Sequence, residues 1–373
     1  MVKNLIVKIN VKKQTYNYNN PLNKSNIKNS SGTGFFIANN YILTCYHVIE
    51  DAVKIYVNHE KTNKEKLKVV IHSLYPDDDL AVLYIDNLKY GIEIPIEIPI
   101  MILKNKLKDS DNSVTVYGYP LNSNTLKITK GTLSGYHKSF FETDATLNPG
   151  NSGGPLIYKN KIIGINASKL ASEKVDNVGY VIPIKRFLLY KKMKNITKGT
   201  KLFEKPTLGI DFHIIDKNNI KNFNLELDHG IRIINITNKI DGIEIGDFML
   251  EFNKMKIDIF GDIKINEFPE KINIDDITRW CYIGQKVTIK IFSMRTKEIK
   301  AIDITLINNN LFPSYYKNYS KDFWIKKGNI TFSQITEGHV QKLQKLNLEL
   351  ESKVFLMNSI YKKIKKKLFY ISY

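Results

Sequence analysis

Short runs of β-branched and aromatic residues, separated by polar turn formers, dominate residues 34–183. Runs of this length and composition, bounded by Asn, Asp, Gly or Pro, are typical of β-strands. One group of runs lies within residues 34–85, and a second group lies within residues 114–183. Two successive groups of about six short strands predict two antiparallel barrels that pack against each other.

The hydrophobic pattern changes its period after Pro183. Residues 186–193 have the spacing of a short helix, and residues 194–206 are polar and indicate a linker. A further unit of about 100 residues, from 207 to 307, mixes strand and helix signals and has the usual size of a domain. Before residue 31, a stretch rich in Asn, Lys and Ser indicates a flexible N-terminal extension.

The basic charge of the chain changes this picture little. The formal net charge is +19, but only four of the 56 basic residues are Arg, and the other 52 are Lys. Arg is preferred for bidentate recognition of phosphates and bases, so this composition argues against a dedicated nucleic-acid site. A surplus of Lys, Asn and Ile is typical of proteins encoded by AT-rich genomes. With 43% hydrophobic residues the 373-residue chain has a globular composition, and we expect no specific nucleic-acid partner.

The cysteines and the apolar segments limit the chemistry and the compartment. Cys45 and Cys281 lie in different predicted domains, which excludes a disulfide framework, and the sequence has no metal-ligand spacing. We therefore expect no metal ion and no cofactor. The apolar run at residues 5–7 is too short for a signal-peptide core, and no later run reaches membrane-spanning length. These features predict a soluble intracellular protein without a membrane partner, and they leave the choice between cytoplasm and nucleus open.

The strongest local motif is the hexapeptide Gly-Asn-Ser-Gly-Gly-Pro at residues 150–155, between two predicted strands. A nucleophilic serine needs a tight turn with backbone N–H groups that can receive an oxyanion, and glycines supply that turn without steric cost. Ser152 is then the predicted nucleophile. The oxyanion hole is expected at Gly150, Asn151 and Ser152, with the N–H groups of Gly150 and Ser152 as donors. A glycine-rich hairpin without a catalytic role is the structural alternative.

A base and a carboxylate for this serine are found earlier in the chain. His47 follows the apolar run at residues 43–46, and Asp79 directly precedes the apolar run at residues 80–83. A carboxylate buried at the start of a strand could hold the imidazole tautomer and stabilise the imidazolium. The chain order His, Asp, Ser is the order of chymotrypsin-like barrels. Other histidines are expected to be structural, namely His59, His72 and His137.

Residues 31–184 resemble the protease domain of the HtrA/Deg family of serine proteases. The resemblance rests on motifs that occur in the family's order, at residues 32–35, 43–48, 79–83, 118–120, 143–156, 163–166 and 179–183. Residues 114–120 and 178–184 are most similar to the eukaryotic intracellular Deg branch. Cys45 and Tyr46 depart from the Asn or Ala that the family usually has, a change that we expect to be tolerated.

The resemblance implies an ATP-independent serine endopeptidase that hydrolyses protein substrates through an acyl-enzyme, with His47, Asp79 and Ser152 as its triad. It also implies a role in protein quality control or processing and a homo-oligomer built from trimers. Two alternatives stay open. One, with the least support, is a polyanion-binding protein that uses its lysines. The other is a catalytically silent member that acts as a PDZ-containing scaffold or chaperone. The presence of all three triad residues argues against it.

Two further expectations concern activation and specificity. Asn151 is uncharged, whereas trypsin-type zymogens have an Asp that pairs with a freshly cut N-terminus, so activation by N-terminal cleavage is not expected. Ordering of loops by ligands or oligomer contacts fits better. No acidic residue lies near the expected specificity pocket, which favours cleavage after small or medium apolar residues. The residues expected to line this pocket are Thr146, Leu147, Ala167 and Leu170.

The unit after the linker resembles the PDZ module that follows the protease in this family, on residues 207–210, 230–233 and 242–250. The resemblance implies that the N–H groups of Leu208, Gly209 and Ile210 receive the C-terminal carboxylate of a peptide, which adds to the sheet as a strand. The alternative is a PDZ-like fold that binds nothing.

The sequence thus predicts a mainly β protein in which a two-barrel chymotrypsin-like protease domain precedes an α+β PDZ-like domain and a short C-terminal segment. The last segment resembles a shortened second PDZ-like unit, and it contains a basic cluster at residues 362–367. The predicted boundaries are 1–30 for the flexible extension, 31–196 for the trypsin-like serine protease domain, 197–307 for the PDZ-like peptide-binding domain and 308–373 for the C-terminal segment.

Overall fold

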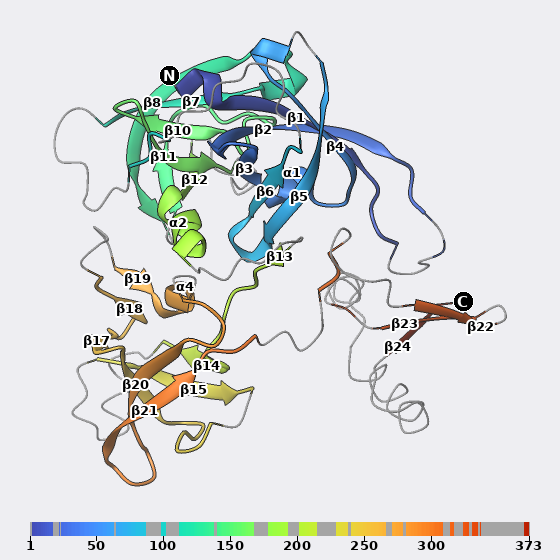
Figure 1. The fold of residues 1–373 in the computed structure, drawn as a ribbon. Coiled ribbons are helices and arrows are strands. Elements are labelled where there is room, and N and C mark those ends of the chain that lie inside the picture. Colours follow the sequence, from blue (N-terminus) through green and yellow to red (C-terminus); the bar gives the residue numbers. More distant parts are fainter. Residues whose placement is uncertain are drawn as a thin grey trace.

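The structure, a computed structural model, describes most of the chain up to residue 308 and short segments beyond it (Figure 1). The described residues are 2–17, 22, 24–62, 65–86, 98–101, 112–137, 140–167, 178–192, 201–214, 229–237, 240–265, 271–278, 281–308, 314–316, 324–327, 330–334, 336 and 369–372.

The first barrel is an antiparallel sheet closed on itself, in the order β5-β4-β1-β2-β3-β6, with β6 paired back to β5. Its strands are β1 (Ile6–Lys13), β2 (Lys28–Ala38), β3 (Tyr41–Cys45), β4 (Ala52–Asn58), β5 (Leu67–Tyr75) and β6 (Leu80–Tyr84). Short helices lie between or before the strands, namely η1 (Val2–Leu5), α1 (Tyr46–Ile49), η2 (Glu60–Thr62) and η3 (Pro76–Asp78). Alternate apolar side chains point inward and form the barrel core, with Phe35 and Leu43 fully buried.

The second barrel closes in the order β10-β11-β12-β9-β8-β7. Its strands are β7 (Ser113–Gly118), β8 (Lys127–His137), β9 (Phe140–Thr143), β10 (Pro155–Tyr158), β11 (Lys161–Asn166) and β12 (Gly179–Pro183). The helix η4 (Pro120–Asn122) follows β7, and α2 (Ile184–Lys192) follows β12. Ile162, Ile165 and Ile182 of this barrel pack into the same apolar cluster as the first-barrel core, so the barrels share a buried interface. The prediction of two packed barrels is confirmed.

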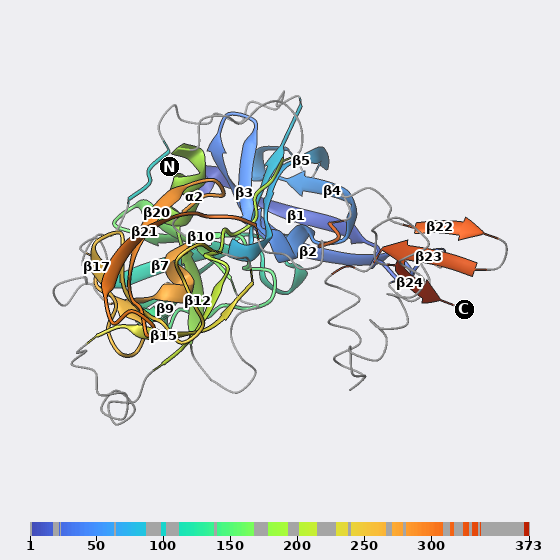
Figure 2. The same cartoon turned by 90° about the horizontal axis from the view of Figure 1, so that it is seen from below.

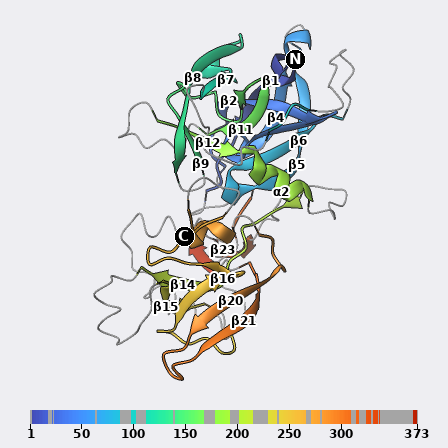
Figure 3. The same ribbon diagram turned by 90° about the vertical axis from the view of Figure 1, so that its left-hand side faces the viewer.

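A separate antiparallel sheet follows, in the order β14-β15-β16-β20-β21 (Figure 3). Its strands are β14 (Ile210–His213), β15 (Ile231–Ile236), β16 (Phe248–Phe252), β20 (Lys286–Phe292) and β21 (Ile299–Thr305), with β17 (Met255–Lys256) paired to β16. A small ladder of β18 (Asp262–Ile263) and β19 (Ile272–Asn273) leads into α4 (Ile274–Ile277). Ile274 and Ile277 of α4 pack into the apolar core of this sheet. The unit therefore combines a sheet with a short helix, as the sequence predicted.

The connection to this unit also contacts the first barrel. Lys201–Leu202 form β13, which pairs in parallel with β5, and the ring of Phe203 stacks on Tyr75 with centroids 4.8 Å apart. These residues belong to the segment predicted as a polar linker, and their apolar side chains explain why they dock instead.

A small sheet near the C-terminus contains β22 (Trp324–Lys327), β23 (Ile330–Gln334) and β24 (Phe369–Ser372), which lie next to one another in Figure 2. The basic cluster at residues 362–367 lies outside the described residues. Among the helices that the structure describes, none has the length and apolar character needed to cross a membrane.

One predicted boundary is wrong. Residues 1–30 were expected to form a flexible extension, but Ile6–Lys13 form β1, which pairs with both β2 and β4. The reason is an alternation of period two, in which Val7, Ile9 and Val11 point into the barrel core. The first barrel therefore begins before residue 31.

We predict that Ile9→Ala lowers the free energy of unfolding by about 2–5 kcal/mol, because Ile9 is fully buried and its side chain leaves a cavity when truncated. Lys12→Ala is the matched control on the same strand, where the exposed side chain predicts a change within about 0.5 kcal/mol. Chemical denaturation followed by circular dichroism measures both. Equal stability of the two variants would contradict the inclusion of β1 in the barrel.

Candidate active site

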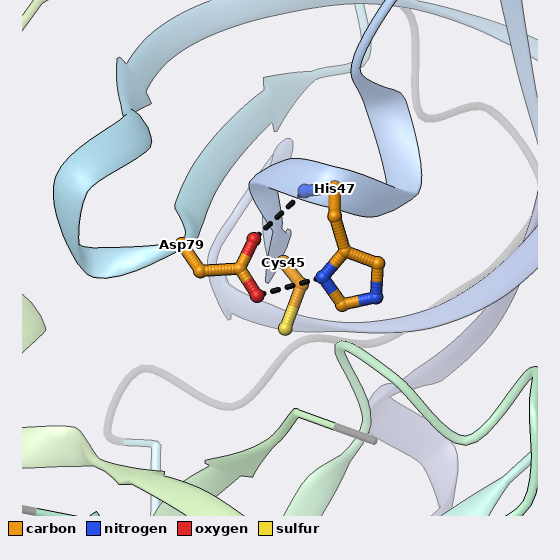
Figure 4. Close-up of side chains that lie close together, drawn as sticks. All are labelled: Cys45, His47 and Asp79. Atoms are coloured by element: carbon orange, nitrogen blue, oxygen red, sulfur yellow. Dashed lines mark hydrogen bonds and ion pairs between the residues drawn. The ribbon is translucent and has the colours of Figure 1, made fainter. Parts of the chain in front are cut away.

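His47 and Asp79 lie in direct contact at the end of the first barrel (Figure 4). His47 lies in α1, which begins directly after β3 ends at Cys45. Nδ1 of His47 lies 2.7 Å from Oδ2 of Asp79, and the backbone N–H of His47 donates to Oδ1 at 2.8 Å. Both oxygens of the Asp79 carboxylate therefore bind His47. A proton on Nδ1 that is donated to Asp79 leaves Nε2 of the ring as the basic nitrogen.

The backbone conformation of Asp79 places its carboxylate. Asp79 directly follows the helix η3 and lies in the left-handed region, with φ 52° and ψ 39°, which short polar side chains tolerate. Its N–H donates to the Pro76 carbonyl at 3.0 Å, and its own carbonyl accepts the N–H of Tyr46 at 2.9 Å. The turn and α1 are thus joined through the backbone as well as through the carboxylate.

Ser152 lies in the tight turn between β9 and β10, next to two glycines that no other residue can replace without strain. Gly150 has φ +105° and Gly153 has φ +84°. A Cβ atom on Gly150 would lie 2.4 Å from the carbonyl oxygen of Tyr119, and one on Gly153 would lie 2.2 Å from the carbonyl oxygen of Thr33. Glycine is required at both positions by conformation and by space.

Thr33 of β2 binds this turn across the barrel interface. Its N–H donates to the Ser152 carbonyl at 3.0 Å, and its hydroxyl donates to the Gly150 carbonyl at 2.7 Å. The same hydroxyl accepts the N–H of Tyr119 at 3.0 Å. A single buried threonine therefore holds the peptide groups that follow Gly150 and Ser152.

The turn also meets the strand that leads to His47. A Cβ atom added to Gly153 would lie 2.2 Å from Oγ1 of Thr44 and 3.0 Å from the backbone nitrogen of Cys45. His47 follows Cys45 by two residues, so the turn of Ser152 and the His47–Asp79 pair lie at the same junction. The turn with Ser152 thus contacts the strand that leads to His47, and the triad itself stays a prediction.

Cys45 lies behind the site. Its thiol donates to the Asn166 carbonyl at 3.2 Å, and the same carbonyl accepts the N–H of Gly153 at 2.8 Å. Burial, and then the nearby Asp79 carboxylate, raise the pKa of the Cys45 thiol well above its usual value, so the thiol stays protonated. The ligand atoms of Cys45, His47 and Asp79 lie within 4.8 Å of one another, a group that could hold a metal ion. In the structure His47 and Asp79 are already bound to each other.

The N–H group of Asn151 is less suited to the predicted oxyanion hole than the N–H groups of Gly150 and Ser152. Its N–H donates to the Asn148 carbonyl at 2.9 Å, and its side chain is buried against Gly118. The N–H of Asn151 is therefore engaged within the turn, and Gly150 and Ser152 stay the predicted donors.

Three of the four residues expected in the specificity pocket lie in the described part of the chain. Leu147 lies against Gly179, where a Cβ atom would approach its Cδ1 to 2.7 Å. Ala167 is fully buried and donates its N–H to the Tyr180 carbonyl at 3.0 Å. The Thr146 carbonyl accepts the hydroxyl of Thr129 at 3.1 Å. The fourth, Leu170, lies outside the described residues.

The loop predicted to receive a peptide carboxylate lies at the start of β14. Gly209 has φ +72°, and the side chains of Leu208 and Ile210 are buried. The N–H of Gly209 donates to Oγ1 of Thr207 at 3.0 Å. One of the three predicted amide donors is thus occupied in this conformation.

Sequence reasoning missed Thr33, Cys45 and Asn166 as site residues. They occur within the motifs at residues 32–35, 43–48 and 163–166, but nothing in the sequence says which of these residues makes a contact across the barrel interface. Only the contacts in the folded chain identify them.

Comparisons with known proteins agree with this geometry. A family model described as a trypsin-like peptidase domain matches residues 32–165. The chain is 33% identical over 207 residues to the mitochondrial Protease Do-like 4 of Arabidopsis thaliana, covering 52% of this chain and 37% of the relative. It is 23% identical over 360 residues to the chloroplastic Protease Do-like 2 of the same plant, covering 91% of this chain and 56% of the relative. The chain spans about half of the length of these curated relatives.

Among solved structures, the HtrA-type protease AlgW with decapeptide matches with a TM-score of 0.61 and 19% identity. The match covers 82% of this chain and 96% of that chain. At this identity the likeness concerns the fold, and it includes the two-barrel arrangement.

We predict that Thr33→Val lowers the free energy of unfolding by about 1–3 kcal/mol, because the Gly150 carbonyl and the Tyr119 N–H each lose the buried hydroxyl that binds them. Thr33→Ser keeps the hydroxyl and is the matched control, with a smaller loss. Urea denaturation measures both variants. A Thr33→Val variant more stable than Thr33→Ser would contradict the role of the hydroxyl.

Proposed function

We propose that this chain, which belongs to the HtrA/Deg family of trypsin-like serine proteases, is a serine endopeptidase that acts through an acyl-enzyme. The observation that carries the proposal is the 2.7 Å contact between His47 Nδ1 and Asp79 Oδ2, at the junction where the turn with Ser152 meets the first barrel. We assign the catalytic triad to His47, Asp79 and Ser152.

The mechanism follows from the roles of these groups. The hydroxyl of Ser152 attacks the peptide carbonyl while Nε2 of His47 accepts its proton. Asp79 holds the ring through Nδ1 and stabilises the imidazolium that forms. His47 then donates the proton to the leaving amine, and water hydrolyses the ester on Ser152 by the same proton transfers in reverse. ATP has no part in these steps.

The oxyanion of each tetrahedral intermediate needs backbone donors. We propose the N–H groups of Gly150 and Ser152, because the N–H of Asn151 between them is engaged with Asn148. The bonds from Thr33 to the carbonyls of Gly150 and Ser152 hold the peptide groups that directly follow these two donor residues. In serine proteases, the loss of one oxyanion-hole donor lowers kcat about 100- to 1,000-fold.

We propose unfolded or flexible protein segments as substrates, and protein quality control or processing as the role. The relatives are named as proteases, and the solved AlgW structure is described as carrying a decapeptide. Trimer-based assembly, implied by the family resemblance, stays a prediction.

The sheet unit after the linker is proposed to be PDZ-like and to bind peptide C-termini. β14 is the first strand in the order of its sheet, so its outer edge can receive an added strand. The loop at Gly209 lies at the start of this edge strand, but binding a carboxylate there requires release of the Gly209 N–H from Thr207.

We predict that Ser152→Ala lowers the rate of hydrolysis of an unfolded protein substrate by about a thousandfold or more, because the nucleophile is lost. Ser123→Ala is the matched control. Ser123 follows η4, and its hydroxyl bonds the Thr125 carbonyl at 2.9 Å. The rate of substrate hydrolysis by Ser123→Ala should stay within about twofold of that of the unaltered chain. Equal activity of Ser152→Ala and Ser123→Ala would exclude Ser152 as the nucleophile.

A second prediction concerns the substrate residue after which the peptide bond is cleaved. The residues assigned to the specificity pocket that the structure describes, Thr146, Leu147 and Ala167, carry no charge. A peptide library should therefore give products cleaved after small or medium apolar residues. A profile dominated by Lys or Arg at that position would overturn this assignment.

A further inference from the structure

Arg186 is one of four arginines in a chain with 52 lysines, and its side chain is fully buried. It lies at the start of α2, directly after the last strand of the second barrel. Lysine dominates the rest of the chain, so a buried arginine here indicates a position that needs a planar guanidinium.

The guanidinium has a carboxylate and an aromatic ring beside it. Nη1 of Arg186 lies 3.4 Å from Oδ1 of Asp78, and both side chains are almost completely removed from solvent. The guanidinium carbon lies 4.3 Å from the ring centroid of Phe140, the first residue of β9. An ion pair in such surroundings depends on both partners, because removal of either leaves an uncompensated buried charge.

Asp78 is the last residue of η3, and the next residue is Asp79. Any shift of Asp78 is passed through one peptide bond to Asp79, whose carboxylate holds the His47 ring. The pair also spans the two barrels, because Asp78 belongs to the first and Arg186 follows the second. The turn that presents Asp79 is thus anchored to the barrel that carries Ser152.

We propose that Arg186 and Asp78 are positioning residues that fix Asp79 against His47, an assignment that rests on the proposed endopeptidase function. Neither side chain touches the substrate in this proposal. A competing explanation is that the pair only joins the barrels and adds stability.

Asp77 provides a matched control within the same turn. Its carboxylate accepts the backbone N–H of Lys205 at an exposed site. Asp77→Asn removes the same charge one residue earlier but leaves the buried pair intact. It should keep kcat within about twofold of the unaltered chain.

The test measures kcat and KM for a peptide substrate in Asp78→Asn, Arg186→Met and Arg186→Lys, after circular dichroism shows that each variant is folded. We expect Asp78→Asn and Arg186→Met to lower kcat roughly 10- to 100-fold with little change in KM. The reason is that a misplaced Asp79 carboxylate no longer orients the His47 ring for proton transfer. Arg186→Lys keeps the charge and should recover part of the loss. Proton NMR should show a shifted or broadened resonance for the His47 Nδ1–H, which a purely stabilising pair would leave in place.

The double variant Asp78→Leu/Arg186→Met covers the case in which single variants do not fold, because it leaves no buried charge unpaired. The proposal predicts a folded double variant with low kcat and an altered Nδ1–H resonance. Folded variants with kcat within about twofold of the unaltered chain and an unchanged resonance would overturn it, as would an equal loss in Asp77→Asn. If the unaltered chain does not hydrolyse peptides, the proposed function fails, while the NMR comparison still tests the positioning of Asp79.

Discussion

The close approach of the turn at residues 150–153 to the first barrel is the constraint on which the site depends. Gly153 has no room for a Cβ atom against Thr33 and Thr44 of the first barrel. Thr33 also binds the carbonyls of Gly150 and Ser152. These contacts require both barrels to be closed and packed. The geometry of the candidate site is therefore a property of the barrel interface, and neither barrel contains it alone.

Several features of the chain serve this interface. β1 completes the first barrel, and β2, to which it pairs, carries Thr33. Cys45 and Gly153 share the Asn166 carbonyl as acceptor, which joins the end of β3 to the end of β11. The Arg186–Asp78 pair crosses the same interface on the side of Asp79. The bond from Cys45 to Asn166 and the Arg186–Asp78 pair each connect a residue close to His47 or Asp79 with the opposite barrel.

The sequence predicted the two barrels and the pairing of His47 with Asp79, because both depend on local patterns. Short alternating runs define the strands. The three aspartates at residues 77–79 place a carboxylate directly before the strand that starts at residue 80. The sequence did not predict β1, although Val7, Ile9 and Val11 alternate, because the polar stretch after it suggested disorder. Thr33, Cys45 and Arg186 could not be assigned, since each binds a residue that lies more than 100 positions away in the chain.

The assignment of Ser152 as a nucleophile is tested most directly by a fluorophosphonate probe, which reacts with a serine only when a base and an oxyanion hole are in place. Mass spectrometry of the labelled chain should locate the adduct on Ser152. Labelling should disappear in Ser152→Ala and become much slower in His47→Ala. A folded chain that forms no adduct, or an adduct that survives Ser152→Ala, would contradict the assignment of this junction as a catalytic site.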